Sequence, residues 1–321
     1  MVEPGKNLSN PYSTGNGGGR FEAHVQASFL ALMLTGGYSP CLPCRPINKI
    51  KLQGKFDGYQ TDDLIVFTNN IGGGVGGKLL GQIKHSITIT EGDSVFGEVV
   101  LSAWQDFNNP DVFIKGSDVI ALITGPLSAT DTGDVRTILD WARHAESAKE
   151  FFEKVNLAQF SSANKRNKLR AIRHHIDAAN GHNAVDEEAV FQFLRHFHFL
   201  GYDLDLKAGV TLALLHSLIG FYSADNVHSI WTRLVDEVQS ANQNAGTIVV
   251  GNLPEDLVNV FRQRKIEEIP SELVVPVSPK AFVFGQDHAQ LSSLAIAALI
   301  GGWNEANESD VELLKEFVNG F

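Results

Sequence analysis

The sequence lacks several features that would assign it to a familiar class of protein. Its 321 residues include no run of about 18 apolar residues, and residues 1–19 are polar and rich in Gly, Ser and Asn. Neither a membrane span nor a signal peptide is therefore expected, and we predict a cytoplasmic protein with no membrane partner.

Cysteine is also scarce. The two cysteines, Cys41 and Cys44, are too few for a disulfide scaffold or for a zinc site made of cysteine alone. Their Cys-x-x-Cys spacing around Pro43 favours two reduced thiols in a loop. A half-site completed by histidines and a redox pair remain as alternatives.

Positive charge is in deficit, with 26 Lys and Arg against 37 Asp and Glu, which gives a formal net charge of −11. This balance argues against a protein that coats nucleic acid through general electrostatic attraction. A nuclease is not excluded, because metal ions and subunit assembly can supply local positive potential near a cleft.

Hydrophobic patterning predicts an α/β unit followed by a mostly helical region. A flexible N-terminus at 1–19 precedes a helix, three strands, a helix and a strand, expected at 20–34, 47–52, 63–67, 79–88, 93–107 and 119–123. Helices are expected next at 134–147, 163–179, 186–199, 208–221 and 225–241. The Gly, Pro, Ser and Thr content of 125–133 places a boundary there, which gives an α/β domain at 20–130 and a helical linker or assembly region at 131–321.

Polar residues at the ends of two predicted strands form a candidate active site. Alternation places Gln82 and Lys84 on one face of their strand, and a hairpin symmetric about Gly73 and Gly74 would set Asp63 opposite Lys84. Glu22 lies beside the apolar stripe of the first helix, so packing of that helix could bring its carboxylate to the same end of the sheet. Three polar side chains and a carboxylate are therefore expected to converge.

The chemistry of this set suits phosphodiester hydrolysis, which needs a hard cation held by oxygen ligands, a positioned water and positive charge near the phosphate. Asp63, Glu22 and the amide oxygen of Gln82 are candidate metal ligands. Lys84 could orient the water and stabilise charge in the transition state. One Asp, one Gln and one Lys on neighbouring strands could instead be a solvated sheet face.

The segments Asp62-Asp63-Leu64-Ile65-Val66 and Gln82-Ile83-Lys84 resemble the D…QxK variant of the PD-(D/E)XK nuclease motif. Glu22, in Gly17-Gly18-Gly19-Arg20-Phe21-Glu22, matches the glutamate that such enzymes often carry on their first helix. The first 125 residues are similar to double-stranded-DNA nuclease effector domains of bacterial antiviral systems of the CBASS and AVAST kinds. Later segments similar to AVAST-type proteins are residues 123–127, 161–173 and 303–305.

The resemblance implies a restriction-endonuclease-like core with Asp63, Gln82, Lys84 and Glu22 as catalytic residues, and Mg²⁺ or Mn²⁺ as cofactor. It implies double-stranded DNA as substrate, self-association as a dimer or tetramer, and a fused STAND-type NTPase and sensor region beyond this chain. Gln82 departs from the commoner acidic residue, and a neutral amide binds a cation less strongly. Asp62 is the alternative catalytic aspartate, although Asp63 directly precedes the apolar strand residues.

Other features of the sequence bear on this hypothesis. The alternative function is a catalytically silent DNA-binding or assembly module. Residues 72–78 read Gly-x-x-x-x-Gly-Lys, but Leu79 replaces the Ser or Thr of a P-loop and a strand is expected to follow. His196 and His198 are expected to be core or surface histidines. Candidate DNA-binding residues, balanced against a solvated face or a subunit contact, are Lys165, Arg166, Lys168, Arg170 and Arg173.

Overall fold

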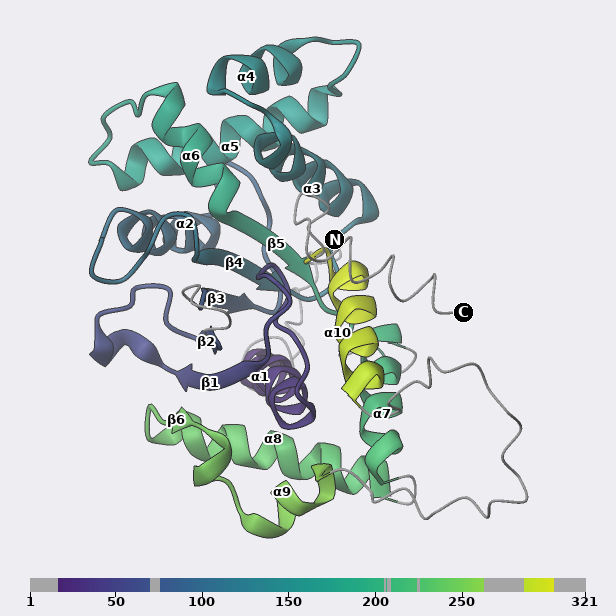
Figure 1. Ribbon diagram of the computed structural model, residues 1–321. Coiled ribbons are helices and arrows are strands. Elements are labelled where there is room, and N and C mark those ends of the chain that lie inside the picture. The colour runs from purple at the N-terminus through teal and green to yellow at the C-terminus, as the bar shows by residue number, and fades with distance from the viewer. Residues whose placement is uncertain are drawn as a thin grey trace, which may run out of the picture.

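A computed structural model describes residues 17–69, 76–204, 206, 209–223, 226–262 and 286–302 of the chain. The predicted flexible segment before residue 17 and residues 303–305, a segment similar to AVAST-type proteins, lie outside these residues. Within the described residues, a six-stranded sheet is covered by helices on both faces (Figure 1). The fold is therefore mixed α/β, with a later region that is mostly helical, as the sequence predicts.

The first half of the chain follows the predicted order of elements. Helix α1 (Gly17–Thr35) leads to strands β1 (Ile47–Leu52), β2 (Leu64–Thr68) and β3 (Lys78–Lys84), with the short 3-10 helix η2 (Gly54–Asp57) after β1. Helix α2 (Ser94–Phe107) and strand β4 (Val119–Thr124) complete this part. The Asp93 carboxylate caps α2 by accepting a hydrogen bond from the backbone N–H of Phe96 at 2.9 Å, so this helix begins where a capping residue stands.

The second half supplies helices and two more strands. The helices are α3 (Ala129–His144), α4 (Ala148–Asn156), α5 (Ala163–Ala179), α6 (Glu187–His196), α7 (Val210–Tyr222), α8 (Val227–Gln243), η4 (Val250–Asn252), α9 (Glu255–Phe261) and α10 (Gln286–Ile300). The strands are β5 (Phe197–Gly201) and β6 (Thr247–Ile248). Both strands join the sheet formed by the first half.

The strand order in the sheet is β5-β4-β3-β2-β1-β6. Strands β3, β4 and β5 are parallel to one another, and the β1–β2, β2–β3 and β1–β6 pairs are antiparallel. The parallel strands are buried on both faces, which explains why 119–123 is a continuous apolar run. The boundary predicted from composition at 125–133 thus falls between two neighbouring strands of one sheet, β4 and β5.

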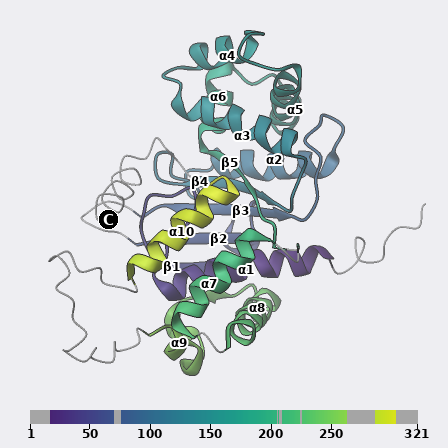
Figure 2. The same ribbon diagram turned by 90° about the vertical axis from the view of Figure 1, so that its right-hand side faces the viewer.

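Two hydrophobic cores lie on opposite faces of the sheet. One core joins α1, α7, α8, α9 and α10 to one face, and α1 contributes the fully buried Phe21 and Phe29. The other core joins α2 to α6 to the opposite face and is rich in phenylalanine, including Phe193 and Phe197. Figure 2 shows the two helical layers above and below the sheet, with α10 beside α7. The sheet, whose strand ends carry the candidate site, is thus packed against helices on both faces.

Three predictions about elements are corrected by the structure. The helix expected at 186–199 ends at His196, and residues 197–201 form β5, parallel to β4. The strand expected at 79–88 ends at Lys84, and α1 begins at Gly17, within the segment predicted to be flexible. Residues 190–200 are rich in apolar side chains and contain no Gly, Pro, Asn or Asp to mark a turn, so their pattern did not reveal the change from helix to strand. The strand predicted after Gly77, in place of a P-loop helix, is confirmed as β3.

Candidate active site

The predicted site residues lie where β2 begins, where β3 ends and where α1 begins. Asp63 immediately precedes β2, and its Oδ2 accepts a hydrogen bond from the backbone N–H of Ile83 at 2.7 Å and another from Gln82 Nε2. Lys84 Nζ lies 3.9 Å from the same oxygen. One carboxylate oxygen therefore connects β2 to the three residues at the end of β3.

The pairing of the two strands differs from the symmetric hairpin predicted from sequence. The observed register pairs Leu64 with Gly81, so that Asp63 stands opposite Gln82 rather than Lys84. The turn between the strands sets the register, and a two-residue shift keeps the same side chains on the same face of the sheet. Lys84, two residues beyond Gln82 on the same face of β3, therefore remains near Asp63.

Glu22 reaches the site from α1 and is held by two amides. Its Oε1 accepts hydrogen bonds from Gln26 Nε2 at 3.0 Å and from Gln53 Nε2 at 2.8 Å. Gln26 Nε2 also donates to the backbone carbonyl of Asp63 at 2.9 Å. The amide of Gln26 thus links the helix carboxylate to the strand that carries Asp63.

The pKa values of both carboxyl groups are raised in the folded protein. Burial, followed by the negative charge of Asp63, raises the pKa of Glu22 from 4.5 to about 7, against the opposing effects of Gln26 and Lys84. Burial also raises the pKa of Asp63, while Lys84 and the hydrogen bond from Ile83 oppose that rise. Glu22 and Asp63 are partly buried acidic groups without full pairing to basic ones, and such a site favours binding of a cation.

Asp62 has a different position from Asp63. Its backbone carbonyl accepts a hydrogen bond from the N–H of Gly54 at 2.8 Å, and its side chain is half-buried. Its negative charge contributes to the raised pKa of Glu22, after the contribution of Asp63. Of the two aspartates, Asp63 is the one whose carboxylate contacts Gln82 and Lys84, and Asp62 remains the alternative.

Three amide residues at the site were not found by the sequence analysis. Gln26 is fully buried, and its Oε1 accepts a hydrogen bond from Asn242 Nδ2 at 2.6 Å, which ties α1 to α8. Gln53 occupies a left-handed conformation with φ of 50° and ψ of 55°. The spacing of four residues between Glu22 and Gln26 was a usable signal, since such residues face each other on a helix. Nothing in the sequence pointed to Gln53 or Asn242.

The donor set fits a hard divalent cation. Asp63 and Glu22 offer carboxylate oxygens, and donation by Gln82 Nε2 to Asp63 leaves the amide oxygen of Gln82 as the atom that could bind a metal. The described part of the chain contains no group of three or more His, Cys, Asp and Glu arranged to hold a metal. A metal here would therefore need the Gln82 amide, the backbone or water to complete its coordination.

The predicted DNA-binding residues lie on α5, and most of their charge has an acidic partner. Lys165 pairs with Asp134 at 2.6 Å and Lys168 with Asp131 at 2.7 Å. Lys168 is also buried and donates to the backbone carbonyl of Ile89. These ion pairs attach α5 to α3, which is a structural role.

The remaining basic residues of α5 are more accessible. Arg173 lies 3.7 Å from Glu187 and is half-buried, Arg170 is exposed and donates to Asn167, and Arg166 donates to the backbone carbonyl of Ser161. Contact of this helix with DNA stays a prediction, and Arg170 is the best placed for it.

The cysteines and histidines noted in the sequence occupy the opposite end of β3, β4 and β5. Cys41 and Cys44 are present as thiols rather than as a disulfide, and burial raises the pKa of Cys41 to about 12. His198 is buried in β5, and burial keeps its pKa well below the usual value. His196 is half-buried, and its ring is tilted against Phe107 and lies at a T-shaped angle to Phe113. These positions agree with the prediction of core or surface histidines.

Comparison with known proteins gives distant structural similarities. No protein-family model and no curated protein matches the chain. Two structures of an Acinetobacter baumannii Cap4 SAVED/CARF-domain containing receptor, one of them with the cyclic trinucleotide 3'3'3'-cAAA, match it at 11% identity with TM-scores of 0.43 and 0.44. The matches cover 76% of this chain and 45% and 46% of those receptors, so the chain spans less than half of their length.

In the described residues, no helix is long and apolar enough to cross a membrane.

Proposed function

We propose that this chain is a metal-dependent endonuclease of the PD-(D/E)XK type that cleaves double-stranded DNA. The observation that carries the proposal is the convergence on Asp63 of Gln82 and Lys84, with Glu22 joined to the same strand through Gln26. These are the residues that the sequence motif singles out, and three separate elements bring them to one end of the sheet.

Each side chain has a role that its surroundings support. The oxygens of Asp63, Glu22 and Gln82 would hold Mg²⁺ or Mn²⁺, which when bound polarises a phosphate and lowers the pKa of a coordinated water. Lys84 retains 31% exposure of its side chain, so it can approach a phosphate from the sheet end. There its charge would stabilise the phosphate as negative charge develops.

The wider role that we propose is that of an antiphage effector activated by oligomerisation, with an attached NTPase and sensor region in a longer protein. This part rests on the similarity of the sequence to nuclease effectors of bacterial antiviral systems. The net charge of −11 also favours activation by assembly, because a single chain has little general attraction for DNA.

The test is degradation of plasmid DNA with Mg²⁺ or Mn²⁺, with and without EDTA, by the wild-type protein and by Lys84→Ala. Loss of one transition-state contact typically lowers the rate about 10²- to 10³-fold. Lys149→Ala is a matched control, because Lys149 also lies 3.9 Å from a carboxylate, that of Glu153, but on the exposed surface of α4. We expect cleavage by the control, none by Lys84→Ala, and none with EDTA.

Two aspartate variants sharpen the assignment. Asp63→Asn should abolish cleavage and weaken Mn²⁺ binding in calorimetry, whereas Asp62→Asn should have the milder effect on both. The reverse order would assign the role to Asp62. If the wild-type protein binds Mn²⁺ and DNA but does not cleave, the chain is a silent DNA-binding or assembly module.

A further inference from the structure

A hollow lies at the end of the parallel strands opposite to the end that carries Lys84. It is lined by residues next to the starts of β3, β4 and β5, together with the segment after α1 and the facing ends of α3 and α6. Its volume is about 660 Å³. We call it the cationic pocket, and the residues that define it here are Leu42, Arg45, Lys115, Arg143, Arg195 and His196.

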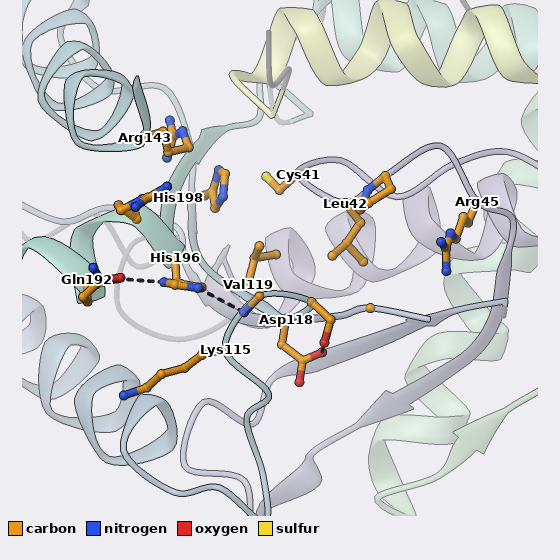
Figure 3. A pocket seen from close by; sticks show the side chains of 15 residues that line it. Cys41, Leu42, Arg45, Lys115, Asp118, Val119, Arg143, Gln192, His196 and His198 are labelled. Carbon is orange, nitrogen blue, oxygen red and sulfur yellow. Dashed lines mark hydrogen bonds between the residues drawn. The ribbon is translucent and has the colours of Figure 1, made fainter. Parts of the chain in front are cut away.

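Positive charge dominates the lining. The lining includes four basic residues, Arg45, Lys115, Arg143 and Arg195, and one acidic residue, Asp118. Figure 3 shows Arg143, Lys115 and Arg45 at different places around the hollow, with the Lys115 side chain extending away from its middle. In a chain of net charge −11, this concentration of cations needs an explanation.

The acidic residue of the pocket is engaged within the protein. Asp118 has no exposed side-chain surface, and its carboxylate pairs with Lys78 at 3.2 Å and accepts backbone hydrogen bonds from Lys78 and Ile114 at 3.0 and 2.9 Å. Its charge is therefore neutralised by groups behind the pocket wall. Asp118 fixes the start of β3 and β4 and does not balance the cations of the pocket.

Two of the cations, Lys115 and Arg195, are held by aromatic contacts that leave their charge in place. Lys115 Nζ lies 4.2 Å from the centre of the Phe107 ring, and the guanidinium of Arg195 lies 5.4 Å from that of Phe191. Aromatic rings orient a cation without neutralising it. Arg143 pairs with Asp140 and donates to the backbone carbonyl of Phe197, so it is the more structural of these residues.

The pocket also has an apolar side. Leu42, Pro43 and Val119 line it next to the cations, and the His196 ring, which contacts Phe107 and Phe113, adds a flat surface. A volume of about 660 Å³ lies within the range of sites for small organic ligands. Cations on several sides with an apolar wall suit a ligand that has both anionic and organic parts.

We propose that the cationic pocket binds a small organic phosphate that carries two or more negative charges and has about the size of a nucleoside diphosphate. The phosphates would contact Lys115 and Arg195, and the organic part would lie against Leu42 and Val119. This site is separate from the candidate active site, since the length of β3 places the two roughly 20 Å apart.

Isothermal titration calorimetry on the full chain, at fixed ionic strength, tests the proposal with ADP, pyrophosphate and adenosine as probes. ADP should bind at least tenfold more tightly than adenosine, which lacks the phosphates. Lys115→Gln and Arg195→Gln should each weaken ADP binding about tenfold, which is the loss expected for one charge-assisted contact. Lys149→Gln removes the same charge from an exposed site on α4, where Lys149 is 84% exposed, and should leave binding unchanged.

Several outcomes would overturn the proposal. They are the absence of ADP and pyrophosphate binding, equal weakening by the control variant, and equal affinity for ADP and adenosine. If ADP does not bind but a single-stranded oligonucleotide does, and its binding depends on Lys115 and Arg195, the pocket is part of a nucleic-acid surface instead. None of these measurements uses DNA cleavage, so failure here leaves the proposed nuclease activity untouched.

Discussion

At the scale of single residues, Gln82 is the proposed metal ligand that departs from the commoner acidic residue. Its Nε2 donates to Asp63, which a glutamate could not do. Gln82→Glu should therefore lower the melting temperature of the metal-free protein, because two carboxylates then face each other, and Mn²⁺ should restore it. We expect this variant to keep part of the cleavage activity, since it recreates the commoner acidic ligand.

Gln82→Leu is the matched comparison. It fills similar space without an oxygen, so we expect loss of cleavage and of Mn²⁺-dependent stabilisation in thermal denaturation. Full activity in both variants would remove Gln82 from the site.

Glu22 gives the site a dependence on pH. Its pKa in the folded protein is raised from 4.5 to about 7, first by burial and then by Asp63. Folding therefore favours the protonated form of Glu22. The contribution of this protonation to the free energy of unfolding is complete below pH 4.5 and is lost as pH rises through about 7. Metal binding needs the ionised form, so Mn²⁺ affinity should rise over the same range.

The measurement is Mn²⁺ titration and metal-free thermal denaturation from pH 5 to 8, on the wild-type protein and on Glu22→Gln. We expect the variant to bind Mn²⁺ more weakly and to flatten the part of both pH profiles centred near the raised pKa of about 7. Parallel profiles for the two proteins would exclude Glu22 as the titrating group.

At the scale of elements, the end of β1 positions the carboxylate of α1. Gln53 follows β1 in a left-handed conformation, at φ 50°, which costs about 1–2 kcal/mol for a residue with a side chain. In this conformation its Nε2 donates to Glu22 at 2.8 Å. Strained backbone conformations cluster at functional sites, so the conformation of Gln53 is consistent with the proposed role of Glu22.

Gln53→Gly separates these two effects. Glycine accepts the left-handed conformation without strain but cannot donate to Glu22, so the melting temperature should change by less than about 3 °C. Cleavage should fall several-fold and the pH profile of Mn²⁺ binding should shift. A variant with wild-type cleavage and an unchanged profile would give Gln53 a purely structural role.

The same scale shows what the sequence could and could not predict. The periodicity of α1 and the alternation at the end of β3 were sufficient to place Glu22, Gln82 and Lys84 on the correct elements. Residues 197–201 were missed as a strand, because the apolar pattern of α6 continues into β5 without a turn residue between them. Local patterns carry no information on pairing, so the link between Gln26 and Asn242, 216 residues apart, could not be foreseen.

At the scale of the whole molecule, we predict that activity depends on self-association. Double-strand cleavage needs two sites that face opposite strands, which a symmetric dimer supplies most simply. Specific activity on plasmid DNA should therefore rise with protein concentration, and a fused oligomerisation tag should raise it at low concentration. Light scattering under the same conditions gives the mass of the active species.

A monomer with concentration-independent activity per molecule would contradict this prediction. The Lys84→Ala protein, carried through the same series, shows whether any rise in cleavage belongs to the candidate site.

The order of strands in the sheet also has a consequence for how the protein is made. The edge strands β5 and β6 leave the ribosome after all four strands that lie between them. At translation rates of 5–20 residues per second, roughly 6–25 s separate the end of β4 at Thr124 from the end of β6 at Ile248. Asn242 donates a hydrogen bond to Gln26, which in turn donates to Glu22, and Asn242 emerges near the end of that interval. The nascent chain therefore carries the motif residues long before it holds them in place.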